Sequence, residues 1–240
     1  MEVLSDLVRF LSEGERWQGN QGIPNLILEH LGYSLVATVI AGVLAVPLAL
    51  WVGHTGRGDT LLVNVANVGR AIPTFGLILT AFVIFGLGVT PVYIALVALA
   101  IPPIVANTAV GVRQVDRDIR EAAEGMGMTG WQVLSRVELP IALPLVMTGL
   151  RTSAVQVVAT ATLAAFVGLG GLGRPIINGL AQGVLTNDNA RSQVIVGAVL
   201  VALLAVLTEV AFGALERVVV PAGLRPEHRA ARAAPVGPAA

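Results

Sequence analysis

The sequence contains no lysine and no cysteine, and its fifteen basic residues are therefore all arginine. Without cysteine the chain has no disulfide, no thiolate nucleophile and no cysteine-ligated zinc site. Without lysine it cannot complete a P-loop, in which a lysine reaches the β- and γ-phosphates of a nucleotide. An ATP-binding subunit is therefore excluded. If the chain takes part in ATP-driven work, ATP and Mg²⁺ must be bound by another polypeptide.

Charge is also scarce, since only 12% of the residues are charged while 55% are hydrophobic, and the formal net charge is zero. This composition is typical of membrane proteins, and it offers no basic surface for nucleic acid. The three histidines, His30, His54 and His228, show no repeating ligand spacing. We therefore expect histidines that flank membrane surfaces rather than a metal site, and no bound cofactor.

The first thirty residues do not read as a signal peptide, because acidic residues precede any apolar run. Their apolar positions recur at helical spacing and are followed by a glycine-rich turn. We expect residues 1–30 to form an extracytoplasmic amphipathic segment that lies on the membrane surface.

Long uncharged runs define the expected fold, an all-α integral membrane protein with five transmembrane helices. The run between Arg70 and Arg113 would extend over ~60 Å as one helix, which is twice the thickness of a ~30 Å hydrocarbon core. It must therefore cross twice, with a break at residues 86–91. The expected spans are residues 31–52, 66–86, 91–112, 139–167 and 192–216. Pro102 and Pro103 lie inside the third span and should kink it, because each removes a backbone donor.

Arginine is distributed unevenly over the two sides that these spans define, with ten residues on one side and four on the other. The first group is Arg57, Arg70, Arg113, Arg117, Arg120, Arg136, Arg217, Arg225, Arg229 and Arg232, and the second is Arg9, Arg16, Arg174 and Arg191. Basic residues favour the cytoplasmic side. We therefore expect the C-terminus in the cytoplasm and the N-terminus outside. Residues 218–240 should form a disordered cytoplasmic tail.

Polar side chains inside the predicted spans are candidates for function. Arg151 and Glu209 lie in the fourth and fifth spans, where they either pair with each other or reach the membrane surface separately. Thr152 and Gln156 belong to a series of small polar residues in the fourth span, which serve helix packing, line a pathway, or do both. The other members of this series are Thr148, Ser153, Thr160 and Thr162.

Two G-x-G-x-x-G strings occur, one from Gly125 to Gly130 and one from Gly168 to Gly173. A dinucleotide site needs such a string between a strand and a helix, and neither follows a predicted strand. We interpret the second string as a tight turn where the chain leaves the membrane.

The most specific pattern is the polar block between the third and fourth predicted spans. It reads Glu121-Ala122-Ala123, three residues, Gly127, nine residues, and then Val137-Glu138-Leu139-Pro140. This block resembles the EAA loop of type-I ABC importer permeases, in which EAA, three residues, Gly and nine residues precede Ile-x-Leu-Pro. Only the isoleucine differs here, and it is replaced by Val137.

The resemblance implies that a short coupling helix, here about residues 120–131, binds in a groove of an ATPase subunit. The residues that match the motif, and that the resemblance makes candidates for ATPase coupling, are Glu121, Ala122, Ala123, Gly127, Leu139 and Pro140. Small residues permit a close approach to a partner, and acids near a helix N-terminus suit the helix dipole. The other interpretation is an ordinary solvated loop with capping acids.

The resemblance to these permeases covers residues 30–217. Within this range, several blocks of the sequence are similar to the permeases of osmoprotectant importers. These blocks are residues 69–78, 102–112, 125–152 and 161–180. It implies a multi-pass protein of the bacterial cytoplasmic membrane with a type-I ABC transmembrane domain over residues 31–217, in a methionine-importer-permease-like architecture. It also implies two ATPase subunits, a second permease subunit (an identical copy or a paralogue) and an extracytoplasmic binding protein.

The expected function is therefore that of a non-catalytic permease subunit for glycine betaine, choline or carnitine. Pathway or gating roles are expected at Pro102, Pro103, Arg151, Thr152, Gln156 and Glu209. An amino-acid importer of the methionine type and an ATP-independent channel remain as alternatives. An intramembrane enzyme has no plausible set of catalytic residues, because no histidine or cysteine is expected inside the membrane and no pair of carboxylates faces each other within one predicted span.

Overall fold

The computed structural model describes residues 2–58, 64 and 73–224, and these residues form helices and turns without a strand. Four helical stretches of this part are long and apolar enough to cross a membrane. They are α2 (Ile23–Thr55), α5 (Val89–Arg113), the continuous stretch Gly130–Val167 and α10 (Asp188–Val219). The protein is therefore an all-helical, multi-span membrane protein.

The second of the five predicted spans, residues 66–86, appears only in part. Its described portion is α4 (Thr74–Phe85), an apolar helix of 12 residues, which is shorter than the four membrane-length stretches. The beginning of this predicted span lies outside the described residues, as do residues 225–240 of the predicted disordered tail. The structure therefore shows four helices of spanning length where the sequence predicted five spans.

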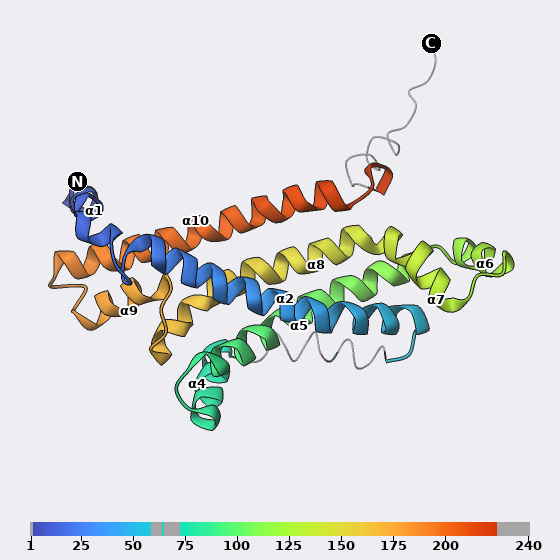
Figure 1. The fold of residues 1–240 in the computed structure, drawn as a ribbon, viewed down its shortest axis with the longest axis horizontal. Coiled ribbons are helices and arrows are strands. Elements are labelled where there is room, and N and C mark those ends of the chain that lie inside the picture. The colour runs from blue at the N-terminus through green and yellow to red at the C-terminus, as the bar shows by residue number, and fades with distance from the viewer. Residues whose placement is uncertain (1, 59–63, 65–72, 225–240) are drawn as a thin grey trace, which may run out of the picture.

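Apart from α4, which lies beside the long helices, most of the shorter elements lie at the two ends of the molecule (Figure 1). α1 (Glu2–Ser12), the 3₁₀ turn η1 (Gly14–Trp17) and α9 (Gly173–Ala181) are at one end, and α6 (Arg117–Gly125) and α7 (Gly130–Val133) are at the other (Figure 1). The stretch from α7 onward continues through the π-helical turn η2 (Leu134–Glu138), α8 (Leu139–Thr160) and the 3₁₀ turn η3 (Ala161–Val167). A further 3₁₀ turn, η4 (Ala222–Leu224), follows α10.

The first long helix begins earlier than the span predicted from residue 31. Gly22 is its N-cap and Pro24 lies in its first turn, where proline needs no intrahelical donor and has a suitable φ. At the other end, Gly56 has a φ of +64°, the left-handed conformation that commonly terminates helices. The segment predicted to lie on the membrane surface therefore ends before Ile23.

A row of small residues on α2 allows it to pack closely against α5. The row has four-residue spacing, its alanines are at most 1% exposed, and they are Ala37, Ala41, Ala45 and Ala49. Gly53 continues the row, and a Cβ atom placed there would lie 2.8 Å from Cβ of Val112 at the end of α5. Such a row lets two backbones approach, which is how helices commonly pack in membranes.

α5 lies between α2 and α8 and contacts both. A Cβ atom at Gly149 of α8 would lie 3.1 Å from the carbonyl oxygen of Pro103, so this contact is also close. The outward faces of α2 and α10 instead carry apolar side chains such as Val43 and Leu207, which are 67% and 62% exposed. This distribution suits a bundle whose sides contact lipid or neighbouring spans.

Candidate functional site

The EAA residues lie on α6, at the end of the molecule opposite α1 (Figure 1). Asp116 begins this helix, because its carboxylate accepts a hydrogen bond from the backbone N–H of Asp118 at 2.9 Å. Glu121 and Ala122 are exposed, whereas Ala123 is only 2% exposed. The motif therefore presents two residues to the surroundings and uses the third to seat the helix.

The helix ends earlier than the predicted range of about 120–131. α6 stops at Gly125, and Gly127 then takes a φ of +83°, a conformation that strains any residue with a side chain. α7 starts with a capping box, in which Thr129 and Gln132 satisfy each other's backbone N–H groups. The predicted single helix is therefore replaced by two short helices joined at a glycine turn.

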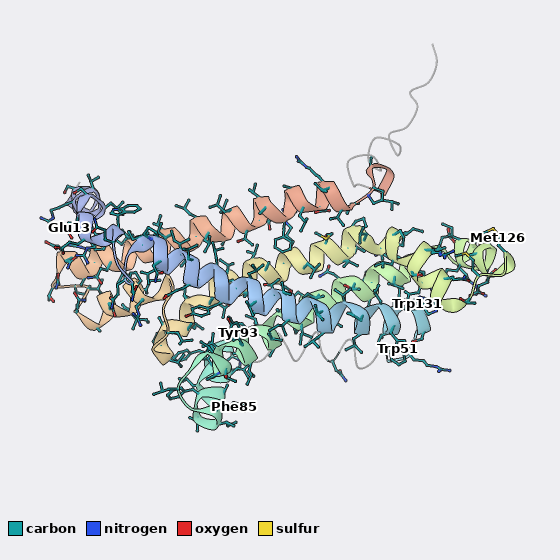
Figure 2. All side chains as sticks on the ribbon, in the orientation of Figure 1. Glu13, Trp51, Phe85, Tyr93, Met126 and Trp131 are labelled. Carbon is teal, nitrogen blue, oxygen red and sulfur yellow. The ribbon has the colours of Figure 1, made fainter. Side chains whose placement is uncertain are left out.

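Exposed apolar side chains project from this otherwise polar end. Met126 is 77% exposed and Trp131 is 75% exposed, and both lie at the α6–α7 end of the molecule, whereas Glu13 lies at the opposite end (Figure 2). Aromatic residues and methionine are enriched at protein interfaces. We call the surface made by Glu121, Ala122, Met126, Gly127 and Trp131 the α6–α7 surface.

A buried carboxylate lies directly behind the α6–α7 surface. Glu138 is 1% exposed, and its two oxygens have different partners. Nε of Arg120, on α6, lies 3.0 Å from Oε1, and Nδ1 of His54, at the end of α2, lies 2.7 Å from Oε2. Arg120 also donates from a terminal nitrogen to the carbonyl oxygen of Val112 on α5. We call Arg120, Glu138 and His54 the Glu138 cluster.

Leu139 and Pro140, the end of the motif, explain the π turn that carries Glu138. Pro140 has no N–H with which to bond the carbonyl four residues before it, and its ring crowds that carbonyl. The N–H of Leu139 bonds instead to the carbonyl of Leu134, five residues back. The widened turn places the Glu138 side chain inside the molecule, and α8 then continues as an ordinary helix.

Arg151 and Glu209 form an ion pair between α8 and α10, which is one of the two arrangements that the sequence left open. Arg151 also faces a second carboxylate, because Nη1 lies 3.7 Å from Oε2 of Glu216, about two helix turns further along α10. Their side chains are 34%, 45% and 19% exposed, respectively. A single guanidinium therefore serves two acids on the neighbouring helix.

Most of the other polar residues of α8 are either buried or exposed, whereas Thr160 at its end is half-buried. Ser153 is buried and donates a hydrogen bond of 2.7 Å to the carbonyl oxygen of Ala100 on α5. Thr148, Thr152 and Gln156 are exposed and follow one another at four-residue spacing, so they form a polar stripe along one side of the helix. Ser153 thus serves helix packing, and the stripe is available to line a pathway.

Pro102 and Pro103 lie within α5, which continues through both as one helix. Polar side chains reach the backbone carbonyls beside them. In addition to the Ser153 bond, the side-chain amide of Asn107 donates to the carbonyl oxygen of Pro103 at 2.8 Å. The proline pair is therefore a region where side chains supplement the backbone hydrogen bonds, as membrane helices require.

His30 and Glu29, for which the sequence predicted no functional role, hold the second glycine string in place. His30 is fully buried, contrary to the expectation of a flanking histidine, with Nε2 2.8 Å from the carbonyl oxygen of Val158. Its Nδ1 accepts a hydrogen bond from Leu172 N–H at 3.3 Å. The neighbouring Glu29 accepts from Gly171 N–H at 2.8 Å. The sequence signal that could have predicted this role is an acid and a histidine side by side at the start of an apolar run, because ionisable residues in a membrane segment are usually functional.

Glycine is required at this turn for lack of space. A Cβ atom at Gly170 would overlap the carboxylate of Glu29, and one at Gly173 would overlap the carbonyl of Thr162. Gly171 has a φ of +84° as well. The string is therefore a tight turn at a span end, as predicted, and it follows the 3₁₀ turn η3 rather than a strand.

The described residues contain no group of three or more histidine, aspartate or glutamate side chains that could hold a metal ion. His228 lies outside the described residues. The notable polar groups are instead the α6–α7 surface with the Glu138 cluster behind it, the Arg151 pair and the α8 stripe.

Similar sequences carry names of transport permeases. OpuCB of Bacillus subtilis (strain 168), a glycine betaine/carnitine/choline transport system permease protein, is 35% identical over 197 residues, which cover 82% of this chain and 88% of that protein. The osmoprotectant import permease protein OsmW of Salmonella typhimurium is 32% identical over 208 residues, which cover 85% of this chain and 94% of that protein.

Similar folds occur in solved ABC transporters. An inward-facing structure of the MetNI methionine ABC transporter matches with a TM-score of 0.70 and 23% identity, over 88% of this chain and all of the matched chain. At this identity the likeness shows the fold, that of a type-I ABC permease. The family described as the binding-protein-dependent transport system inner membrane component matches residues 37–220. This chain belongs to that family.

Proposed function

We propose that this chain is the permease subunit of an ATP-binding cassette importer and forms the membrane pathway for osmoprotectants such as glycine betaine, choline or carnitine. The α6–α7 surface is the observation that carries the proposal, because it presents the EAA motif at one end of an apolar helical bundle. The solutes named for the relatives at 32–35% identity support this substrate class.

Energy for transport comes from a separate ATPase. The lysine-free chain has no P-loop, and the exposed Met126 and Trp131 suit contact with another protein. The complete importer contains two ATPase subunits, a second permease that is either an identical copy or a paralogue, and an extracytoplasmic binding protein. This chain itself is not an enzyme and binds no nucleotide.

The chain crosses the membrane five times, and α4 belongs to the second crossing. The N-terminus lies outside, and the α6–α7 surface lies in the cytoplasm. α6, α7 and the C-terminal ends of α2, α5 and α10 lie toward one end of the molecule, and α1 and α9 lie at the other (Figure 1). The described arginines Arg113, Arg117, Arg120 and Arg136 belong to the first end, which supports this orientation by the positive-inside rule.

Coupling begins at Glu121, Ala122 and Gly127, which face the ATPase. Ala123 seats α6, and Leu139 and Pro140 place the π turn behind it.

The pathway runs along the polar stripe of α8, which includes Thr152 and Gln156. Arg151 and Glu209 tie α8 to α10 beside it, and Pro102 and Pro103 provide the pivot in α5.

The test is uptake by the complete transporter in proteoliposomes, with radiolabelled glycine betaine, choline, carnitine and methionine outside and ATP inside. We expect uptake of at least one of the three osmoprotectants, and none when the ATPase subunit carries a substitution of its P-loop lysine. Uptake of methionine alone would support an amino-acid importer. Uptake that persists without ATP hydrolysis would support a channel, and either outcome would contradict the proposal.

A further inference from the structure

We propose that Glu138 is a positioning residue that joins α6 to α2, so that movement of the α6–α7 surface reaches the first long helix through the Glu138 cluster. The proposal rests on the proposed function, because it assigns specific side chains to the coupling step of an ATP-driven importer. It concerns Arg120, Glu138 and His54, of which only Glu138 lies within the EAA motif, at the position where the motif accepts any residue.

Four elements converge on this one carboxylate. Glu138 itself belongs to η2, its oxygens meet Arg120 of α6 at 3.0 Å and His54 of α2 at 2.7 Å, and Arg120 also bonds to the last turn of α5 at Val112. The carboxylate is 1% exposed, so it is enclosed by protein and Arg120 and His54 are its charged neighbours. A displacement of α6 must either carry these partners along or break contacts made by a buried charge.

The position of α2 in the chain makes this contact important. α6 is covalently close to α5, which precedes it, and to α8, which follows it through α7 and η2. In contrast, His54 and Glu138 are 84 residues apart, so α2 receives movement from α6 only through non-covalent contacts. Gly53 packs against Val112 next to His54, and the polar contact therefore sits where α2 and α5 are already in close apposition.

α7 also packs closely against His54. A Cβ atom at Gly130 would lie 3.3 Å from Nε2 of His54, closer than nearly all such contacts. The first residue of α7 therefore leaves room for the imidazole ring, whose other nitrogen bonds to Glu138. The imidazole ring at the end of α2 is therefore held by Gly130 of α7 and by Glu138 of η2.

A purely stabilising role explains this arrangement less well. A buried ion pair adds little stability relative to apolar residues of the same size, because both charges must be desolvated. What it provides is a directional contact that fixes how the joined elements are oriented. A carboxylate that uses one oxygen for α6 and the other for α2 is suited to transmit a displacement between them.

The experiment uses the complete transporter in proteoliposomes, with the variants Glu138→Gln, His54→Gln and the double variant. We expect each to assemble with the ATPase and to hydrolyse ATP, but the solute taken up per ATP hydrolysed should fall by about tenfold, which is a typical size for coupling between sites. The double variant should be no worse than Glu138→Gln alone, because both changes break the same link. Arg136→Gln, an exposed arginine on the same π turn, is the matched control and should behave as wild type.

A second measurement does not depend on the transported solute. The chain has no cysteine, so nitroxide labels can be placed at only two chosen positions, Leu35→Cys on α2 and Val206→Cys on α10, both of which are well exposed. In the wild-type background, trapping with ATP and vanadate should change the distance distribution between the labels. In the Glu138→Gln background this change should be lost while the nucleotide-free distribution stays the same.

Two outcomes would contradict the proposed role of the Glu138 cluster. One is a Glu138→Gln transporter with a wild-type ratio of uptake to hydrolysis and a wild-type response of the labels. The other is a joint loss of assembly, hydrolysis and thermal stability, which would show a structural role only. Failure of the wild-type transporter to take up any osmoprotectant would contradict the proposed substrate class. The label measurement would still test whether the Glu138 cluster joins α6 to α2.

Discussion

At the scale of single residues, the fit between α2 and α5 depends on a missing side chain. Gly53 ends the row of small residues on α2, and a β-carbon there would come within 2.8 Å of Cβ of Val112. Gly32 belongs to the same helix, but it is exposed and has no atom within 4 Å of the equivalent position. These two glycines allow the cost of overpacking to be separated from the effect of helix propensity.

We expect Gly53→Ala to lower the free energy of unfolding by about 1–3 kcal/mol, because the added methyl group must displace backbone or a branched side chain. Gly32→Ala should raise it by roughly 0.5–1 kcal/mol, because alanine loses less conformational freedom in a helix. Denaturant unfolding of the detergent-solubilised protein measures both. Equal shifts in the two variants would contradict the close packing described for α2 and α5.

The sequence singled out the EAA residues and offered an Arg151–Glu209 pair as one of two alternatives, but it gave no role to Glu138 or His30. The EAA residues stand at fixed offsets within one short block, so their relation is visible in the sequence. The partners of Glu138 and His30 lie on other helices far away in the chain. Which side chain meets a buried carboxylate or imidazole is decided by helix packing, and no local pattern records it.

At the scale of elements, α8 and α10 are held together by one arginine on α8 and two glutamates on α10. Arg151 is shared between Glu209 and Glu216, so each acid has one basic partner while the arginine has two acids. Removing the arginine therefore leaves two carboxylates near each other, whereas removing Glu209 leaves the arginine with Glu216. An uncompensated charge within a membrane span is costly.

We accordingly expect Arg151→Gln to reduce both the amount of folded protein and uptake far more than Glu209→Gln does. Adding Glu209→Gln to Arg151→Gln should restore part of the loss, because it removes one of the two unpaired carboxylates. Fluorescence-detected size-exclusion chromatography measures folded protein, and proteoliposome uptake measures activity. If Glu209→Gln proved the more harmful single change, the shared arrangement would be wrong.

The two short helices at the other end make a prediction about coupling. Glu121→Arg reverses the charge of an exposed residue, and Gly127→Trp places a large side chain on a backbone with a φ of +83°. Both variants should insert into the membrane but abolish uptake and the stimulation of the ATPase. Gly125→Ala, at a position with no neighbouring atoms and ordinary backbone conformation, should retain both activities. Normal uptake by Glu121→Arg and Gly127→Trp would contradict coupling through this surface.

Element boundaries were less predictable than element types. A coupling helix over residues 120–131 was expected as one unit, yet Gly127 in a left-handed conformation divides it into α6 and α7. The span expected from residue 31 starts at Ile23, because Gly22 and Pro24 supply a helix start that the hydrophobic run alone does not mark. Hydrophobicity predicts which segments are buried in the membrane, whereas caps and turns decide where each helix ends.

At the scale of the whole molecule, the composition was sufficient to predict an all-helical membrane protein. The number of crossings depended on the uncharged run between Arg70 and Arg113, which is too long for one span. Four described stretches reach spanning length, and α4 supplies a shorter apolar helix within that run. Among the described residues, Arg117 and Arg120 lie on α6 and Arg136 lies on η2, so these three arginines are close to one another in the chain and in the fold.

The turn from Gly168 to Gly173 closes on the start of α2, where the carboxylate of Glu29 occupies the space that a methyl group on Gly170 would need. A side chain at Gly170 would therefore require the Glu29 carboxylate to move away from its hydrogen bond with Gly171. A relative with alanine in place of Gly170 should also have exchanged the acid of α2 for a shorter residue. A compilation of family sequences would reveal this as paired substitution between two distant sites.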